Sequence, residues 1–136
     1  MIMQKNNNTP YIPVSWGELI DKVTILEIKE KKIKSTESLL NIKKELKYLN
    51  DVLNNETKKV ELISELKLEL YKVNEQLWIT EDNIRLKEKK CEFDNSFIST
   101  ARNVYILNDK RAKLKKMINE ILKSELIEEK GYENYK

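Results

Sequence analysis

The stretch V-S-W-G-E-L-I-D-K-V-T-I-L, residues 14–26, contains the clearest structural signal in the chain. Ser15 is a residue type favoured at helix N-caps, and Glu18 follows it three positions later, so the two form a capping box. This signal predicts a helix over residues 16–33. The apolar residues of that helix recur at steps of three and four, which places one stripe on its inner face: Leu19, Ile20, Val23, Leu26 and Ile33.

Outward from this stretch the backbone contains almost no helix-breaking residue. The chain of 136 residues has two glycines and two prolines, and residues 18–130 contain neither type. Strands joined by tight turns usually need glycine or proline, whereas long helices exclude both from their interiors. Charged residues make up 36% of the chain and hydrophobic residues 40%. These features predict an all-α fold with a heavily charged exterior.

Three further helices follow from the apolar spacing. The second begins at a cap formed by Ser35 or Thr36 and ends near Leu53, and its leucines and isoleucine keep a coiled-coil spacing. The third and fourth helices are predicted over residues 59–89 and 96–124. At 1.5 Å per residue each is about 45 Å long. Short connections make neighbouring helices antiparallel, so we predict an antiparallel bundle of about four helices in which the last two form a long hairpin.

The prolines and the charge pattern divide the chain into three parts. Residues 1–13 are predicted to be a flexible or extended segment, residues 14–124 a single helical domain, and residues 125–136 a C-terminal tail. The start has no apolar core typical of a secretory signal, and no apolar run is long enough to span a bilayer. We therefore expect a cytoplasmic protein without a membrane partner.

The composition excludes several kinds of chemistry. The chain has no histidine and a single cysteine, Cys91, so histidine-assisted nucleophiles and thiolate metal sites are not expected. We assign no catalytic residue, no metal ligand and no cofactor. The net charge is +3, but lysines and glutamates alternate closely rather than forming a basic block. Nucleic acid is accordingly an unlikely partner.

Polar residues interrupt the apolar pattern of the third and fourth helices in one region. On the third helix three polar residues and a tryptophan follow one another at steps of three and four: Asn74, Trp78, Glu81 and Arg85. On the fourth helix Arg111 stands in register with apolar residues. The chain has 23 lysines but only three arginines, and all three arginines fall in this region. Arginine supplies a planar fork of donors that lysine cannot imitate. The candidate ligand-binding residues are Asn74, Trp78, Glu81, Arg85, Arg102, Tyr105, Asn108 and Arg111.

Two functions compete for this cluster. An interhelical network of arginine, carboxylate and asparagine often fixes the register of helices without a ligand. The favoured hypothesis is therefore an interaction or oligomerisation module rather than an enzyme, with a second copy of the chain as its partner. The alternative is a binding protein or enzyme for a small carboxylate or phosphate, in which Arg85, Arg102 and Arg111 form an anion clamp.

Four segments also carry a family signature: V-S-W-G-E-L-I-D-K-V-T-I-L-E-I-K (14–29), V-N-E-Q-L-W-I-T-E-D-N-I-R (73–85), F-I-S-T-A-R-N-V-Y-I-L-N-D-K-R-A-K-L-K (97–115) and E-E-K-G-Y (128–132). Together they resemble a bacterial and marine-metagenome family of unknown function. Trp16 departs from the smaller residue expected between the serine and the glycine. The resemblance implies a shared helical fold and places the candidate cluster inside the signature segments.

Overall fold

The chain folds into five helices without a strand over residues 8–136, which are the residues that the computed structural model describes. This confirms the all-α prediction. Residues 1–7 of the predicted N-terminal segment 1–13 lie outside the described part. None of the described helices is both long enough and apolar enough to cross a bilayer. The helices are α1 (Trp16–Lys32), α2 (Thr36–Asn54), α3 (Thr57–Leu62), α4 (Ser64–Lys89) and α5 (Asn95–Ile121).

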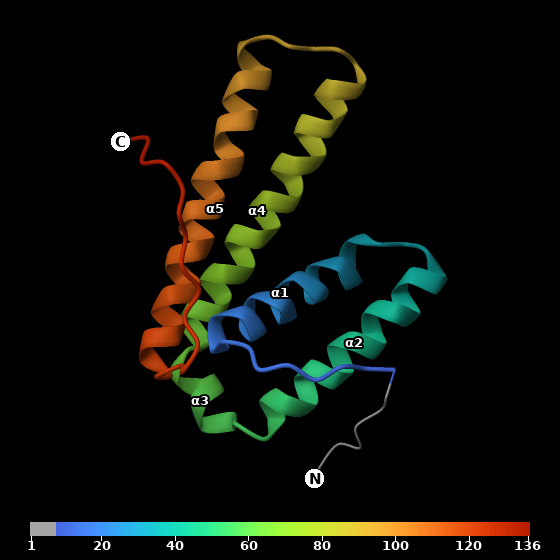
Figure 1. The fold of residues 1–136 in the computed structure, drawn as a ribbon. Helices are drawn as coiled ribbons and strands as arrows, with labels where there is room; N and C mark the ends of the chain where they lie inside the picture. The colour runs from blue at the N-terminus through green and yellow to red at the C-terminus, as the bar shows by residue number, and fades with distance from the viewer. Residues whose placement is uncertain (1–7) are drawn as a thin grey trace.

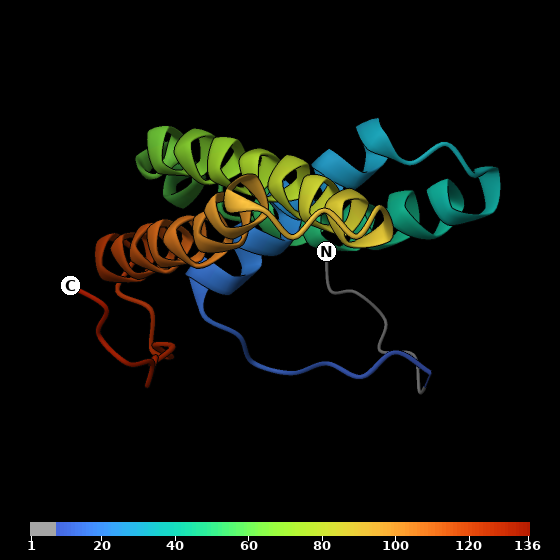
Figure 2. The same ribbon diagram turned by 90° about the horizontal axis from the view of Figure 1, so that it is seen from above.

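The helices are arranged as two pairs that meet at one end of the molecule. Figures 1 and 2 show α4 and α5 side by side and running in opposite directions, joined by the turn after α4. Helix α1 contacts α2 on one side and both α4 and α5 on the other. The upper parts of α4 and α5 stand clear of α1 and α2 (Figure 1). Helix α1 is thus the element that connects the two pairs.

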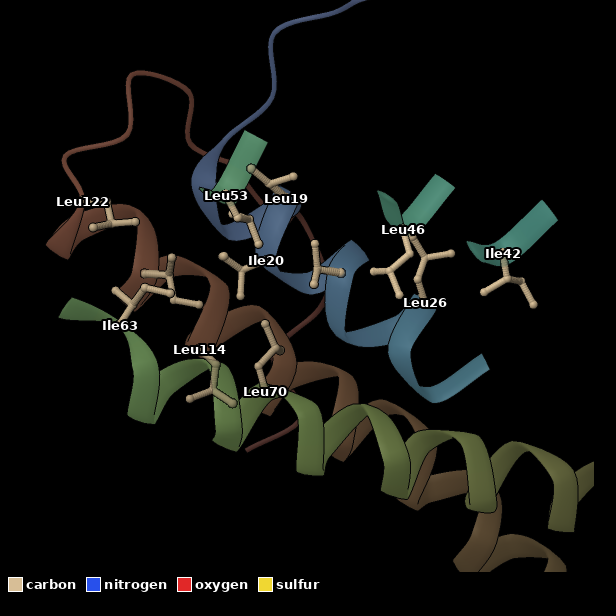
Figure 3. Close-up of a cluster of buried hydrophobic side chains, with 12 residues drawn as sticks. Leu19, Ile20, Leu26, Ile42, Leu46, Leu53, Ile63, Leu70, Leu114 and Leu122 are labelled. Atoms are coloured by element: carbon tan, nitrogen blue, oxygen red, sulfur yellow. The ribbon is translucent and has the colours of Figure 1, made fainter. Parts of the chain in front are cut away.

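The hydrophobic core lies where α1 meets the other long helices (Figure 3). Ile20, Leu70 and Ile118 have no exposed surface and come from α1, α4 and α5 respectively. Each such side chain stabilises the fold by about 1.5–3 kcal/mol relative to an exposed position. Helix α2 adds a stripe of its own along α1: Ile42, Leu46 and Leu53.

Side-chain caps fix where α1 and α5 begin. The Ser15 hydroxyl accepts a hydrogen bond from the Glu18 amide at 3.1 Å, as the sequence predicts. The Glu18 carboxylate, however, binds Lys115 Nζ at 2.9 Å, so its half of the capping box is used in a tertiary contact. At α5 the cap is Asp94, whose Oδ1 accepts from the Phe97 amide at 3.0 Å. This hydrogen bond lowers the pKa of Asp94.

The predicted third helix is divided in two, which makes five helices rather than about four. The break falls at Ile63, whose backbone (φ −113°, ψ 18°) separates α3 from α4. Neither glycine nor proline marks this position. Ile63 is 1% exposed and belongs to the core, while its neighbour Leu62 is 68% exposed. Tertiary burial of Ile63 therefore accompanies a break that the local sequence does not indicate.

The core does not reach the far ends of α4 and α5. We call residues 81–106 the distal arm. All of them are described, and none has a buried side chain. Four large apolar side chains of the arm are exposed: Leu86, Phe93, Ile98 and Tyr105. The arm is therefore held together mainly by contacts between two helices, with the C-terminal tail adding a contact at Tyr105.

Candidate functional site

A buried carboxylate on α1, Asp21, is the centre of the polar contacts between the helices. Gly17, Thr24 and Ile28 share its face of the helix because they are spaced by three or four residues. This face is directed at α4 and α5, and the Asp21 side chain is 1% exposed. A charged group at this depth is stable only when it is paired and hydrogen-bonded.

Arg111 of α5 supplies that pairing with a two-pronged contact. Its Nε donates to Asp21 Oδ1 at 2.9 Å and its Nη2 donates to Asp21 Oδ2 at 2.5 Å. The hydrogen bonds to Asp21 raise the pKa of Arg111. The two opposite charges neutralise each other inside the protein.

Asn74 of α4 completes what we call the central network, formed by Asp21, Thr24, Asn74 and Arg111. Its Nδ2 donates to Asp21 Oδ1 and to Thr24 Oγ1, both at 2.9 Å. The Thr24 hydroxyl donates to the Asp21 carbonyl at 2.7 Å. The network thereby ties α1 to α4 and α5 through directional bonds, which fixes their register.

A second ionic contact adjoins the network at Lys115. The Lys115 side chain is 7% exposed, and its Nζ lies 2.9 Å from Glu18 and 4.0 Å from Asp21 Oδ2. The same Nζ lies 3.4 Å from Glu128 of the C-terminal tail. Lys115 therefore joins α1, α5 and the tail.

The start of α1 approaches α5 so closely that only glycine fits at position 17. The Gly17 amide donates to Asn119 Oδ1 at 2.6 Å. A Cβ atom at this position would lie 2.5 Å from the backbone oxygen of Lys115, well inside van der Waals contact. The absence of a side chain at Gly17 lets Asp21 reach Arg111 one turn further along.

Beside the network lies an open pocket of about 290 Å³ that we call the interhelical groove. Six of the eight candidate residues line it, and they come from α4 and α5. Trp78 is half-buried, and Arg85 is 79% exposed with its Nη2 3.7 Å from Glu81 Oε2. The lining residues are Ile25, Ile28, Asn74, Leu77, Trp78, Glu81, Asp82, Arg85, Asn108 and Arg111.

The other two candidates, Arg102 and Tyr105, lie elsewhere. Arg102 is exposed and its Nε donates to the Tyr105 hydroxyl at 3.4 Å. Arg102 and Arg111 are nine residues apart, and about 100° of rotation per residue places them on opposite sides of α5. Arg102 lines a different surface pocket, with Thr80 and Asn83, from the groove that holds Arg85 and Arg111. The three arginines do not form one clamp.

The sequence-based analysis also missed the carboxylate that Arg111 binds. Asp21 is not among the candidate residues, and the structure pairs Arg111 with this carboxylate of the first helix. A signal was present, because Gly17, Asp21 and Thr24 form a stripe of small and polar residues at steps of four and three. Such a stripe on a helix that is apolar elsewhere indicates a face that contacts polar groups.

The C-terminal tail covers a second, larger cavity of about 740 Å³ on α5. Tyr135 packs edge-on against Tyr105 with 4.9 Å between ring centroids. Asn108 and Arg111 line this cavity as well as the interhelical groove. The tail runs back along α5 (Figure 1), so Arg111 lies between the groove and the tail.

Within residues 8–136 no three His, Cys, Asp or Glu side chains are grouped so that they could hold a metal ion. Cys91 is a free, exposed thiol.

Comparisons with known proteins identify the family of the chain. No match was found among curated proteins or among solved structures. A family described as a family of unknown function, DUF6165, matches residues 11–135, which is nearly the whole chain. The chain therefore belongs to the DUF6165 family of unknown function.

Proposed function

We propose that this chain is an interaction module that associates with a second copy of itself through the distal arm, an antiparallel hairpin formed by α4 and α5. The observation that carries this proposal is the lack of any buried side chain over residues 81–106, where four large apolar side chains are exposed. Two helices alone cannot enclose an apolar core. Pairing with another helical hairpin produces a four-helix bundle.

The charge of the arm favours a copy of this chain as the partner. Residues 81–106 contain five basic and five acidic side chains, so the net charge of the arm is zero although the chain carries +3. Two arms related by a twofold axis can therefore meet without net repulsion, with basic groups of one near acidic groups of the other.

In this proposal the central network has a structural role. The Asp21 carboxylate is saturated by Arg111 and Asn74, which supports a function in holding the arm at a fixed angle to α1. The three-arginine anion clamp has less support, because Arg102 lies on the far side of α5. The free, exposed thiol of Cys91 suits a reducing compartment such as the cytoplasm.

Sedimentation equilibrium over a range of concentrations tests the proposal. The wild-type chain should sediment as a dimer at high concentration, and the Leu86→Gln/Ile98→Gln variant as a monomer. A matched control is Leu40→Gln/Leu62→Gln, which removes two leucines that are 66% and 68% exposed but lie on α2 and α3. This control should leave the dimer intact. A wild-type chain that stays monomeric at every concentration rules out the proposal.

A further inference from the structure

The free charges of the interhelical groove have the opposite sign to the charge of the chain. Arg111 is neutralised by Asp21 within the central network. Glu81 and Arg85 pair with each other at 3.7 Å, so the charge that remains at the groove is the negative charge of Asp82. Asp82 has no ion-pair partner among residues 8–136, so its carboxylate is available to a ligand.

The floor of the groove offers a hydrogen-bond acceptor that the fold does not use. Asn74 is 5% exposed, and its Nδ2 gives one hydrogen to Asp21 and the other to Thr24. This fixes the orientation of the amide, because the reversed orientation would place its oxygen against the Asp21 carboxylate. Asn74 Oδ1 has no partner among the described hydrogen bonds, and it is not sealed from solvent. A ligand with N–H donors could bind it.

The walls of the groove supply an aromatic face and apolar surface. Trp78 is half-buried one turn from Glu81 and Asp82 on α4. Ile25 and Ile28 of α1 line the opposite side. A tryptophan face attracts cations electrostatically, most strongly where water is partly excluded.

From these groups we infer that the interhelical groove binds a small organic cation, an alkylammonium ion. One ammonium group contacts the carboxylates of Glu81 and Asp82 and the face of Trp78, while the hydrocarbon part lies against Ile25 and Ile28. A second N–H donor of the ligand, about two helical turns away, binds the oxygen of Asn74. Arg85, which is 79% exposed, stays at the rim and leaves the ammonium position free. The volume of about 290 Å³ suits a ligand of metabolite size. Glu81, Asp82 and Arg85 also belong to the distal arm, so ligand binding and self-association are tested separately.

Titration with two matched probes tests it. Cadaverine and glutarate have carbon chains of the same length and opposite charge. Binding is followed by calorimetry and by tryptophan fluorescence in a Trp16→Phe background, which leaves Trp78 as the reporter. Cadaverine should bind and glutarate should not. Because the contact is ionic, the affinity for cadaverine should fall as salt is raised.

Substitutions then locate the site. Glu81→Gln and Asp82→Asn should each raise the Kd for cadaverine roughly tenfold, equivalent to about 1.4 kcal/mol. Glu120→Gln makes the same charge change at an exposed position of α5 away from the groove, so it should leave the Kd unchanged. Repeating the titrations in the Leu86→Gln/Ile98→Gln variant separates binding from self-association. The inference is overturned if cadaverine does not bind, if glutarate binds better, or if Glu81→Gln and Asp82→Asn have no larger effect than Glu120→Gln.

Discussion

The two ends of the α4–α5 pair are built from the same kind of helix but are held in different ways. At the end crossed by α1, side chains from several helices enclose Leu70 and the Asp21–Arg111 pair. At the other end, none of residues 81–106 has a buried side chain. One end is stabilised by a core shared among several helices, whereas the other has the contacts between two helices and one contact of the tail at Tyr105.

This difference shows that amphipathic spacing does not establish burial within one chain. Ile98 and Tyr105 are apolar residues one heptad apart on α5, as core residues would be, yet both are exposed. What distinguishes the buried end is the presence of α1, with Gly17 and Asp21 on the face that meets α5. Substitutions at matched positions of the two ends can break or sharpen the comparison.

The largest effect is expected for Arg111→Ala. This change removes both hydrogen bonds of Arg111 to the buried Asp21 carboxylate and leaves Lys115 Nζ, 4.0 Å away, as its ionic neighbour, at a cost of about 3–5 kcal/mol in the free energy of unfolding. Arg102→Ala removes the same side chain from an exposed position of the same helix and should change stability by less than about 0.5 kcal/mol. Urea unfolding of both variants gives the comparison. Equal losses of unfolding free energy in the two variants would show that Arg111 in the central network stabilises the chain no more than an exposed arginine does.

The next largest effect concerns leucines at the two ends of α4. Leu70→Ala empties a position with no exposed surface and should destabilise the chain by about 2–5 kcal/mol. Leu86 is 49% exposed in the arm, so Leu86→Ala should cost less than about 1 kcal/mol in the monomer. Thermal unfolding at low protein concentration measures both. A monomer that loses as much stability at Leu86 as at Leu70 would mean that the arm has a core of its own.

A smaller loss is expected for Gly17→Ala. The new methyl group would press on the Lys115 backbone and force α1 away from α5, at a cost of about 1–3 kcal/mol. Gly131 has no atom within 4 Å of the corresponding position, so Gly131→Ala is the control and should be nearly neutral. Urea midpoints that shift equally for the two glycines would contradict the close approach.

The smallest effect is the response of the arm to acid. The hydrogen bond from the Phe97 amide lowers the pKa of Asp94 below its ordinary value of 3.8. A lowered folded-state pKa stabilises the start of α5 above the unfolded pKa, and this contribution is lost as the pH falls through the folded pKa. The protection factor of the Phe97 amide, which corrects for the intrinsic exchange rate at each pH, should therefore fall below about pH 4. In Asp94→Asn, which keeps an N-cap without a titrating group, this fall in protection should be absent.

The sequence predicts the features of this fold that depend on local chemistry. The Ser15 cap is predicted because a side-chain oxygen beside a free amide is a local arrangement. The break at Ile63 is not visible locally, because it depends on burial against other helices. Contacts between residues of separate helices depend on tertiary packing, so local sequence patterns do not predict them.

In the candidate site, too, the sequence predicts which residues share one face of a helix but not which residues meet between helices. Asn74, Trp78, Glu81 and Arg85 line one groove because steps of three and four residues keep them on one face. Arg102 lies near Arg111 in the sequence, but the helical rotation over nine residues places the two side chains on opposite sides of α5. The partner of Arg111 lies ninety residues away, at Asp21. Pairwise spacing within α5 cannot identify a carboxylate on α1.

The central claim is that the distal arm becomes buried only when two copies meet, whereas the α1 crossing is complete in one chain. Amide hydrogen exchange measured at low and high protein concentration tests it most directly. We predict that protection of amides in residues 81–106 rises with concentration, while protection around Asp21 and Leu70 does not change. Protection of the arm that is the same at every concentration would contradict the account.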